Sequence, residues 1–170
     1  MLSGQPKPLE YRGDVQDATG WKIARLVSPS QGRFAGLAFG EYGMSAKAVC
    51  ERVKTHIAPV AGCECGFHAL AERSRAVGLL SGRRAGFVLL KVELYGTLVV
   101  HRDGIRGNEQ DVTEIALPAV CVRAFCRRKT IALRPKGRRW LPVCAGHSGA
   151  GTVSLVEMHA ALGVDVNTIR

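Results

Sequence analysis

Hydrophobic and polar positions show their clearest strand-like pattern over residues 87–100, a run rich in β-branched and aromatic side chains. The pattern predicts one long strand, with Gly96 as a bulge or bend, or two strands that join at Gly96. A turn over residues 101–108 and a partner strand over residues 111–122 are expected to follow. A looser alternation over residues 21–27 predicts a further short strand.

Apolar residues recur at helical spacing in three other places. The spacing predicts helices over residues 45–54, 67–80 and 154–162, because apolar residues three and four positions apart share one face of a helix. Gly163 is placed to end the last of them. Four glycines between residues 32 and 43 predict an irregular loop. Together these elements predict an α+β fold with a small antiparallel sheet and two or three short helices.

The chain of 170 residues is long enough for one domain with a small addition. Its 46% hydrophobic and 22% charged residues exclude a disordered chain or a coiled coil. We expect an extended N-terminal arm over residues 1–19 and an α+β core with a possible zinc site over residues 20–120. A zinc-ribbon-like basic hairpin over residues 121–148 and a C-terminal helix and tail over residues 149–170 complete the predicted organisation.

Cysteine content gives the first candidate chemistry. The chain has six cysteines, no apolar run of about 18 residues, and no apolar segment typical of a secretory signal near its start. We therefore expect a cytoplasmic protein, in which cysteines are ligands or buried thiols rather than disulfides. Free cysteines are among the most buried residue types, so plain burial in the core is the alternative to metal binding.

The first cysteine group has the spacing C-x5-H-x6-C-x-C. Its members are Cys50, His56, Cys63 and Cys65. Structural zinc takes four thiolate or imidazole ligands in a tetrahedron, and the closely spaced pair at the end of the group favours a turn on which two sulfurs converge. His68 is an alternative to His56 as the histidine ligand.

The second group has the spacing C-x4-C-x17-C-x2-H, which is similar to that of a zinc ribbon or zinc finger. Its members are Cys121, Cys126, Cys144 and His147. Strands over residues 130–133 and 140–143, with a tip over residues 134–138, are predicted between its two halves. A hairpin this short rarely holds together without a staple, which a metal would supply. Either one zinc site or two is compatible with the spacings, and each would be structural because four protein ligands leave no open position.

Charge adds a second candidate surface. The net charge is +10, and the 17 arginines outnumber the 7 lysines, which suits bidentate contacts to phosphate. Eight cations and no acid lie between residues 121 and 140. They are Arg123, Arg127, Arg128, Lys129, Arg134, Lys136, Arg138 and Arg139. Trp140 and Phe125 would add base stacking if they face outward. The alternatives are a solvated basic face with both rings buried, and an arginine content set by GC-rich coding.

One short motif points to catalysis. Residues 101–108 read HRDGIRGN, which resembles the H-x-D-G-x3-N turn of His-Asn-His nucleases. The resemblance implies His101 as general base and Asn108 as the residue that orients it. The second metal-binding histidine of that family is missing and the following sequence does not continue its pattern, so an ordinary turn with Asp103-Gly104 at its tip is the favoured interpretation.

A second resemblance covers roughly residues 20–115. The run from Cys50 through His56-Ile-Ala-Pro59 to Cys63-Glu-Cys65-Gly66, followed by the strand that contains Leu94-Tyr95-Gly96, resembles a family of small bacterial proteins of uncharacterised activity. The resemblance implies that the four residues of the first cysteine group belong together. It implies no activity, and it leaves the second cysteine group as an addition to the family pattern.

The sequence thus favours a zinc-stabilised basic protein that binds RNA or DNA without catalysing a reaction, and a place in a larger nucleoprotein assembly is compatible with this expectation. A module that docks on an acidic protein surface is the first alternative. A metal-dependent nuclease that uses His101 and Asn108 is the second.

Overall fold

The computed structural model describes residues 17–37, 40–83 and 86–169 of the chain. Its strands are β1 (Asp17–Ser28), β2 (Arg33–Ala35), β3 (Glu41–Tyr42), β4 (Ser45–Lys47), β5 (Phe67–Leu70), β6 (Phe87–His101), β7 (Gly104–Leu117), β8 (Ala132–Lys136), β9 (Arg139–Val143), β10 (Val153–Ser154) and β11 (Asp165–Thr168). Its helices are α1 (Arg73–Ser81), α2 (Leu155–Leu162) and the 3-10 turn Ala145–His147. The described part is therefore mostly β, with two short α-helices.

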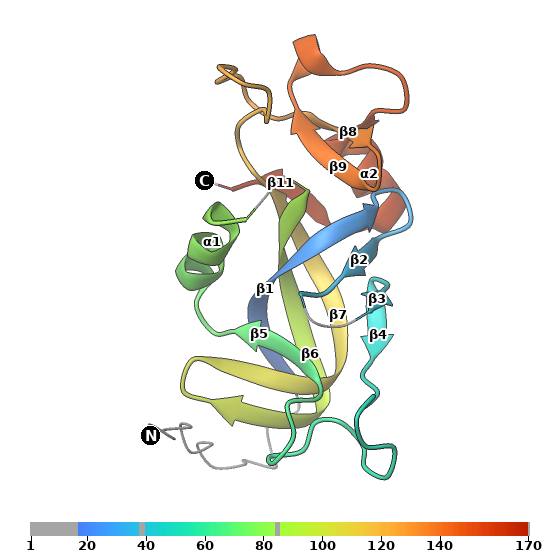
Figure 1. The fold of residues 1–170 in the computed structure, drawn as a ribbon, viewed down its shortest axis with the longest axis vertical. Helices are drawn as coiled ribbons and strands as arrows, with labels where there is room; N and C mark the ends of the chain where they lie inside the picture. Colours follow the sequence, from blue (N-terminus) through green and yellow to red (C-terminus); the bar gives the residue numbers. More distant parts are fainter. Residues whose placement is uncertain (1–16, 38–39, 84–85, 170) are drawn as a thin grey trace.

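Four strand pairings form a closed ring in the larger sheet. β6 pairs antiparallel with β1 on one side and with β7 on the other. β5 pairs with β7 and, through Trp21 and Leu70, with β1. β2 and β3 extend the sheet beyond β1, while β4 and the parallel strand β11 pair with β7. The long strands β1, β6 and β7 thus form the centre of the molecule (Figure 1).

The two faces of β6 bury different clusters. Val88, Leu90, Val92 and Leu94 alternate along one face and belong to the main core. Leu89 points to the opposite face, where it belongs to a smaller cluster. That cluster also contains Ala76 and Leu80 of α1, together with Ile23 and Ala116. Because both faces are covered, β6 is a nearly continuous apolar run rather than a strict alternation.

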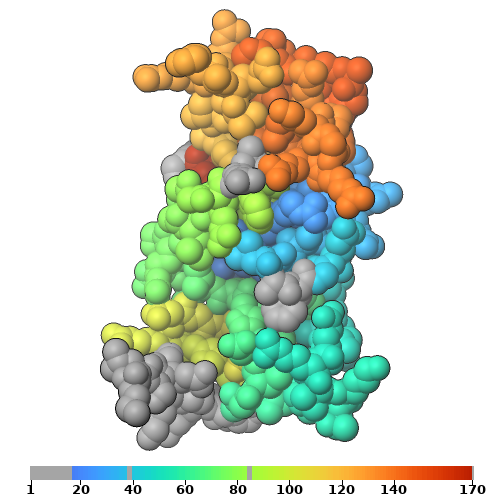
Figure 2. Space-filling view, in the orientation of Figure 1, coloured from blue at the N-terminus to red at the C-terminus, as the bar shows by residue number. Residues whose placement is uncertain are grey.

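The segment with the second cysteine group packs on the same core. β8, β9 and β10 form a separate three-stranded sheet. Leu133 of β8 and Met158 of α2 are fully buried in the main core, and the indole Nε1 of Trp140 donates to the carbonyl of Val27 at 3.0 Å. This sheet and its loops form one end of the molecule, and residues 48–66 lie near the other end (Figures 1 and 2).

Several sequence predictions are confirmed. The long strand over residues 87–100 is β6, and its register against β7 shifts between Tyr95 and Leu98 around Gly96, which has φ +75°. The last helix is α2, with Ser154 and Glu157 in a capping box and Gly163 in the left-handed conformation. The hairpin between the halves of the second cysteine group is also present, although β8 and β9 extend closer to its tip than predicted.

The predicted helix over residues 45–54 is wrong. Residues 45–47 form β4, which pairs with β7, and an irregular loop follows. Two of the apolar positions that suggested a helix do not enter the core, since Val49 is 79% exposed and Val53 is 42% exposed. The backbone N–H of Val53 instead donates to the Cys50 sulfur at 3.3 Å, which bends the chain around a candidate ligand.

Three other elements are only partly as predicted. The region expected to be an irregular loop over residues 32–43 contains the short paired strands β2 and β3. The helix expected over residues 67–80 is split, because 67–70 form β5 between β1 and β7 before α1 begins at Arg73. The partner strand begins at residue 104 rather than 111, since the turn after His101 is only two residues long. The α+β prediction is therefore right about antiparallel sheet and short helices, but it understates the strand content.

The expected N-terminal arm lies outside the described residues except for 17–19, which belong to β1. None of the helices in the described ranges has the length and apolar content needed to cross a membrane.

Candidate metal centres

The first cysteine group lies in the loop between β4 and β5. The structure brings Cys50, His56, Cys63 and Cys65 together, with all four ligand atoms within 4.8 Å of one another. The Cys50 and Cys63 sulfurs are 3.8 Å apart, and His56 Nε2 is 3.2 Å from the Cys65 sulfur. His68 is not part of this group, since its Nε2 donates to the carbonyl of Glu64 at 2.8 Å.

The second cysteine group lies beside the three-stranded sheet. Its four ligand atoms, from Cys121, Cys126, Cys144 and His147, are also within 4.8 Å of one another. His147 Nδ1 is 3.3 Å from the Cys121 sulfur and 3.4 Å from the Cys144 sulfur, and the Cys126 and Cys144 sulfurs are 3.8 Å apart. The 3-10 turn that follows Cys144 brings His147 back towards that residue, through a bond from the His147 N–H to the Cys144 carbonyl.

None of the three cysteines in either group forms a disulfide. The sulfur separations of 3.8 Å are nearly twice the S–S bond length of about 2.05 Å, so neither pair is a disulfide. Each group instead presents three sulfurs and one imidazole nitrogen around a common centre, which is a donor set that could hold a metal ion.

The surroundings of Cys121 favour its ionised form. Burial acts to raise the pKa of this thiol, but hydrogen bonds from the backbones of Arg123 and Cys144 and from His147 outweigh that effect and lower the pKa to about 6. Thiolates are the form of cysteine that binds metals. Backbone N–H groups directed at sulfur therefore make Cys121 ready to act as a ligand at neutral pH.

Arg106 of β7 ties the first group to the sheet. Its side chain is buried, and its guanidinium donates to the carbonyls of Cys63, Cys65 and Val60. Its Nε also donates to the Nε2 of His101 at 2.9 Å. A buried arginine is costly unless its donors are satisfied, and here residues 60–65 of the loop, which include two candidate ligands, supply most of the acceptors.

The two residues of the proposed nuclease motif serve the same loop and are not brought together. Asn108 is 4% exposed and donates from Nδ2 to the carbonyl of Ala58, while its Cβ faces Gly96. His101 accepts from Arg106, and its pKa is lowered by burial and by the charge of that arginine. Both side chains are therefore engaged in contacts within the fold.

The eight cations of residues 121–140 are all exposed. They are Arg123, Arg127, Arg128, Lys129, Arg134, Lys136, Arg138 and Arg139. None of them takes part in the ion pairs found within the described ranges, and no acid lies between residues 121 and 156. They extend from the loop that carries Cys121 and Cys126 to the tip of the β8–β9 hairpin, which joins the second cysteine group to a continuous basic segment.

The two aromatic residues of this segment have opposite placements. Trp140, expected as a stacking residue, packs against the main core and donates to the carbonyl of Val27, so its ring is committed to the fold. Phe125 is entirely exposed. The expectation that Trp140 contributes to an outward-facing surface is therefore not met, because the ring holds the hairpin against β1.

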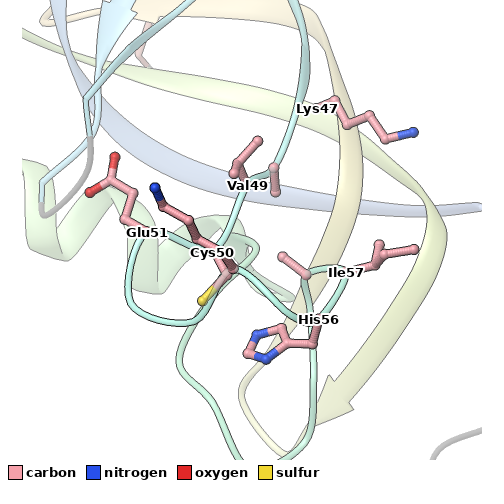
Figure 3. Close-up of a pocket in the computed structure, with 9 residues that line it drawn as sticks. Lys47, Val49, Cys50, Glu51, His56 and Ile57 are labelled. Carbon is pink, nitrogen blue, oxygen red and sulfur yellow. The ribbon is translucent and has the colours of Figure 1, made fainter.

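An open hollow of about 580 Å³ lies next to the first cysteine group. It is lined by residues 47–51, 54 and 56–58, and Figure 3 shows Cys50 and His56 on neighbouring arms of the loop. Val49 and Ile57 on its rim are 79% and 75% exposed. The hollow is wide and mostly apolar.

Sequence reasoning identified both cysteine groups but missed Arg106. The sequence gives no local pattern that marks Arg106 as buried. Its burial, together with that of Gly107 and Asn108, is seen only in the structure. No protein-family model, curated protein or solved structure matches the chain. The resemblance of residues 20–115 to a bacterial family therefore remains an expectation.

Proposed function

We propose that the protein holds two structural zinc ions and binds nucleic acid through the basic segment of residues 121–140. The observation that carries the proposal is the placement of eight exposed cations, none of them in an ion pair of the described residues, on the segment that also carries the second cysteine group.

The donor geometry supports zinc as the metal. Two Zn–S bonds of about 2.3 Å at the tetrahedral angle place the sulfurs ~3.8 Å apart, and a Zn–N bond of about 2.0 Å places nitrogen and sulfur ~3.5 Å apart. One sulfur pair in each group is separated by 3.8 Å, and three of the nitrogen-to-sulfur distances are 3.2, 3.3 and 3.4 Å. Four protein ligands complete the coordination shell, so each ion would hold the fold together and would not activate water.

Charge balance supports the same assignment. Three thiolates around one Zn²⁺ leave one net negative charge at each site. Arg106 is buried beside the first group, with donors on the carbonyls of Cys63 and Cys65. The guanidinium of Arg128 lies against Gly146, where a Cβ atom would come within 3.1 Å of it. Arg128 is therefore next to the turn that carries Cys144 and His147. A buried cation next to the first group is explained if that group holds a net negative metal centre.

The basic segment is well suited to phosphate. Like charges at this density repel one another unless anions neutralise them, and nucleic-acid backbones release counterions when they do so. The segment is held by the hairpin, by Leu133 in the core and by the Trp140 hydrogen bond, so its cations are presented on a rigid surface. Rigid presentation lowers the entropy cost of binding.

Metal content is the first test. Native mass spectrometry of protein purified without added metal is expected to show two zinc ions per chain. Removal of the metal by a chelator is expected to unfold at least the second cysteine group and its hairpin, since structural zinc contributes about 10–16 kcal/mol in small zinc modules. A fully folded protein with no bound metal would contradict the zinc assignment.

Salt dependence tests the nucleic-acid proposal. The variant Arg134→Gln, Lys136→Gln, Arg138→Gln is expected to weaken binding to a labelled oligonucleotide and to lower the slope of log K against log salt by about 2–3. The matched control Lys54→Gln, Arg83→Gln, Arg102→Gln removes the same charge from exposed positions outside residues 121–140. Equal effects of the two variants would show that only net charge matters and would reject the basic segment as the binding surface.

Protein docking is a second candidate function, favoured by one observation. The hollow beside the first cysteine group is rimmed by exposed apolar side chains, and isolated monomers seldom leave such patches without a purpose. The double variant Val49→Ser, Ile57→Ser would reduce capture of a protein partner without changing oligonucleotide affinity. The two functions are therefore separable at opposite ends of the molecule.

A further inference from the structure

Phe125 is the most unusual side chain in the described part of the chain. It is exposed to 106% of the reference value for phenylalanine, and its backbone has φ +60°. It is also the one residue other than glycine with positive φ across the described ranges. Bulky side chains rarely adopt this region of backbone space, because Cβ then approaches the backbone carbonyl.

The fold gains nothing from a phenylalanine at this position. The turn that contains it is closed by a hydrogen bond from the Cys126 N–H to the Arg123 carbonyl at 3.0 Å, and glycine or asparagine is the usual residue at a positive-φ position of such a turn. A fully exposed ring makes no core contacts that would offset the backbone strain. Strain of this kind at an exposed site is a marker of function.

The surroundings of the ring indicate what it contacts. Phe125 lies between the candidate ligands Cys121 and Cys126, and the N–H of Cys121 donates to the carbonyl of Arg128 at 3.0 Å, so both ends of the loop are fixed. Arg123 and Arg127 lie within two residues of the ring and are exposed, as is Arg128. An exposed aromatic face with arginines at neighbouring positions of the same loop combines a surface for base stacking with contacts for phosphate.

We propose that Phe125 is a stacking platform for an unpaired base and that the ligand of the basic segment is single-stranded nucleic acid. This inference rests on the proposed function. In a duplex both faces of each base are already covered by neighbouring bases, so a protruding ring gains a stacking partner only from a single strand, a loop or an end. Phosphates on either side of the stacked base would contact the surrounding arginines.

The test compares variants that separate stacking from folding. Phe125→Gly removes the ring and relieves the backbone strain, so the midpoint of unfolding is expected to stay the same or rise, while affinity for a single-stranded 12-mer falls about tenfold or more. Phe125→Trp is expected to keep the affinity and to show fluorescence quenching when bases stack on the new indole. Val156→Ala, at another exposed apolar position, is the matched control and is expected to change neither property.

The affinity of each variant is measured for three probes of the same sequence: single-stranded RNA, single-stranded DNA and a duplex. Preference for single strands that disappears in Phe125→Gly supports the inference, whichever sugar binds more tightly. Equal affinity of wild type and Phe125→Gly for single strands would overturn the stacking role while leaving nucleic-acid binding intact. Absence of salt-dependent binding to all three probes by the wild type would overturn the proposed function as well.

Discussion

Replacement of Arg106 by methionine should weaken the first cysteine group and leave the second unchanged. Methionine has a similar apolar stem but removes the guanidinium that donates to the carbonyls of Cys63, Cys65 and Val60 and to His101. The part of the loop that carries Cys63 and Cys65 then loses its side-chain hydrogen bonds to Arg106 of β7, while the bond from Asn108 to the Ala58 carbonyl remains. The carbonyls that it contacted lose charged donors in a buried setting.

The size of the effect follows from these contacts. A hydrogen bond from a charged donor contributes about 1.5–3 kcal/mol, and leaving a buried acceptor without a partner costs about 1–3 kcal/mol. Loss of a group that orients metal ligands typically lowers metal affinity about 10- to 100-fold. We therefore expect Arg106→Met to destabilise the protein by about 3–5 kcal/mol and to release zinc from the first group at least tenfold more readily than wild type.

The second cysteine group is an internal control for this measurement. Native mass spectrometry during a chelator titration is expected to show an early one-zinc species in Arg106→Met, with His147 still bound to metal in long-range ¹H–¹⁵N spectra. Arg102→Met, at an exposed neighbouring cation, should release both ions as wild type does. Equal loosening of both ions in Arg106→Met, or release identical to wild type, would refute the anchoring role.

Three further predictions follow from the structure. Burial lowers the pKa of Lys22 from 10.5 to about 7. The unfolded chain therefore binds this proton more tightly, and the free energy of unfolding should rise by up to ~1.4 kcal/mol per pH unit between about pH 7 and 10.5. Lys22→Met should remove that rise in chemical denaturation, and an unchanged slope would contradict the burial argument. Trp140→Phe should lose about 1 kcal/mol of stability through its missing bond to the Val27 carbonyl, with oligonucleotide affinity unchanged. In long-range ¹H–¹⁵N spectra the zinc-bound nitrogens should be Nε2 of His56 and Nδ1 of His147, and the opposite tautomers would show that the ligand geometry is wrong.

The elements predicted well are those whose signals are local. The capping box of Ser154 and Glu157 and the left-handed Gly163 define α2 through neighbouring residues alone. The strand over residues 87–100 is recognisable because its side chains suit a buried β-strand on both faces. Such patterns need no knowledge of distant parts of the chain.

The failures occur where a distant strand decides the conformation. Apolar residues at helical spacing over residues 45–54 suggested a helix, yet Ser45–Lys47 pairs with β7 and Val49 is left exposed. Residues 67–70 form a strand because they pair with β7 on one side and with β1 on the other. Pairing partners more than 30 residues away in the chain override local periodicity.

The candidate sites divide in the same way. Sequence alone grouped the six cysteines into two sets, because a tetrahedral centre needs four donors and their spacing along the chain limits which can meet. It left His56 and His68 as alternatives in the first set, and the structure places His56 there. Only the tertiary structure decided the roles of the other residues. It buries Arg106 behind the first group, assigns His101 and Asn108 to holding that loop, turns Trp140 towards the core and leaves Phe125 in solvent. These outcomes depend on which face of a strand or turn each side chain occupies, and that is set by packing between segments far apart in sequence.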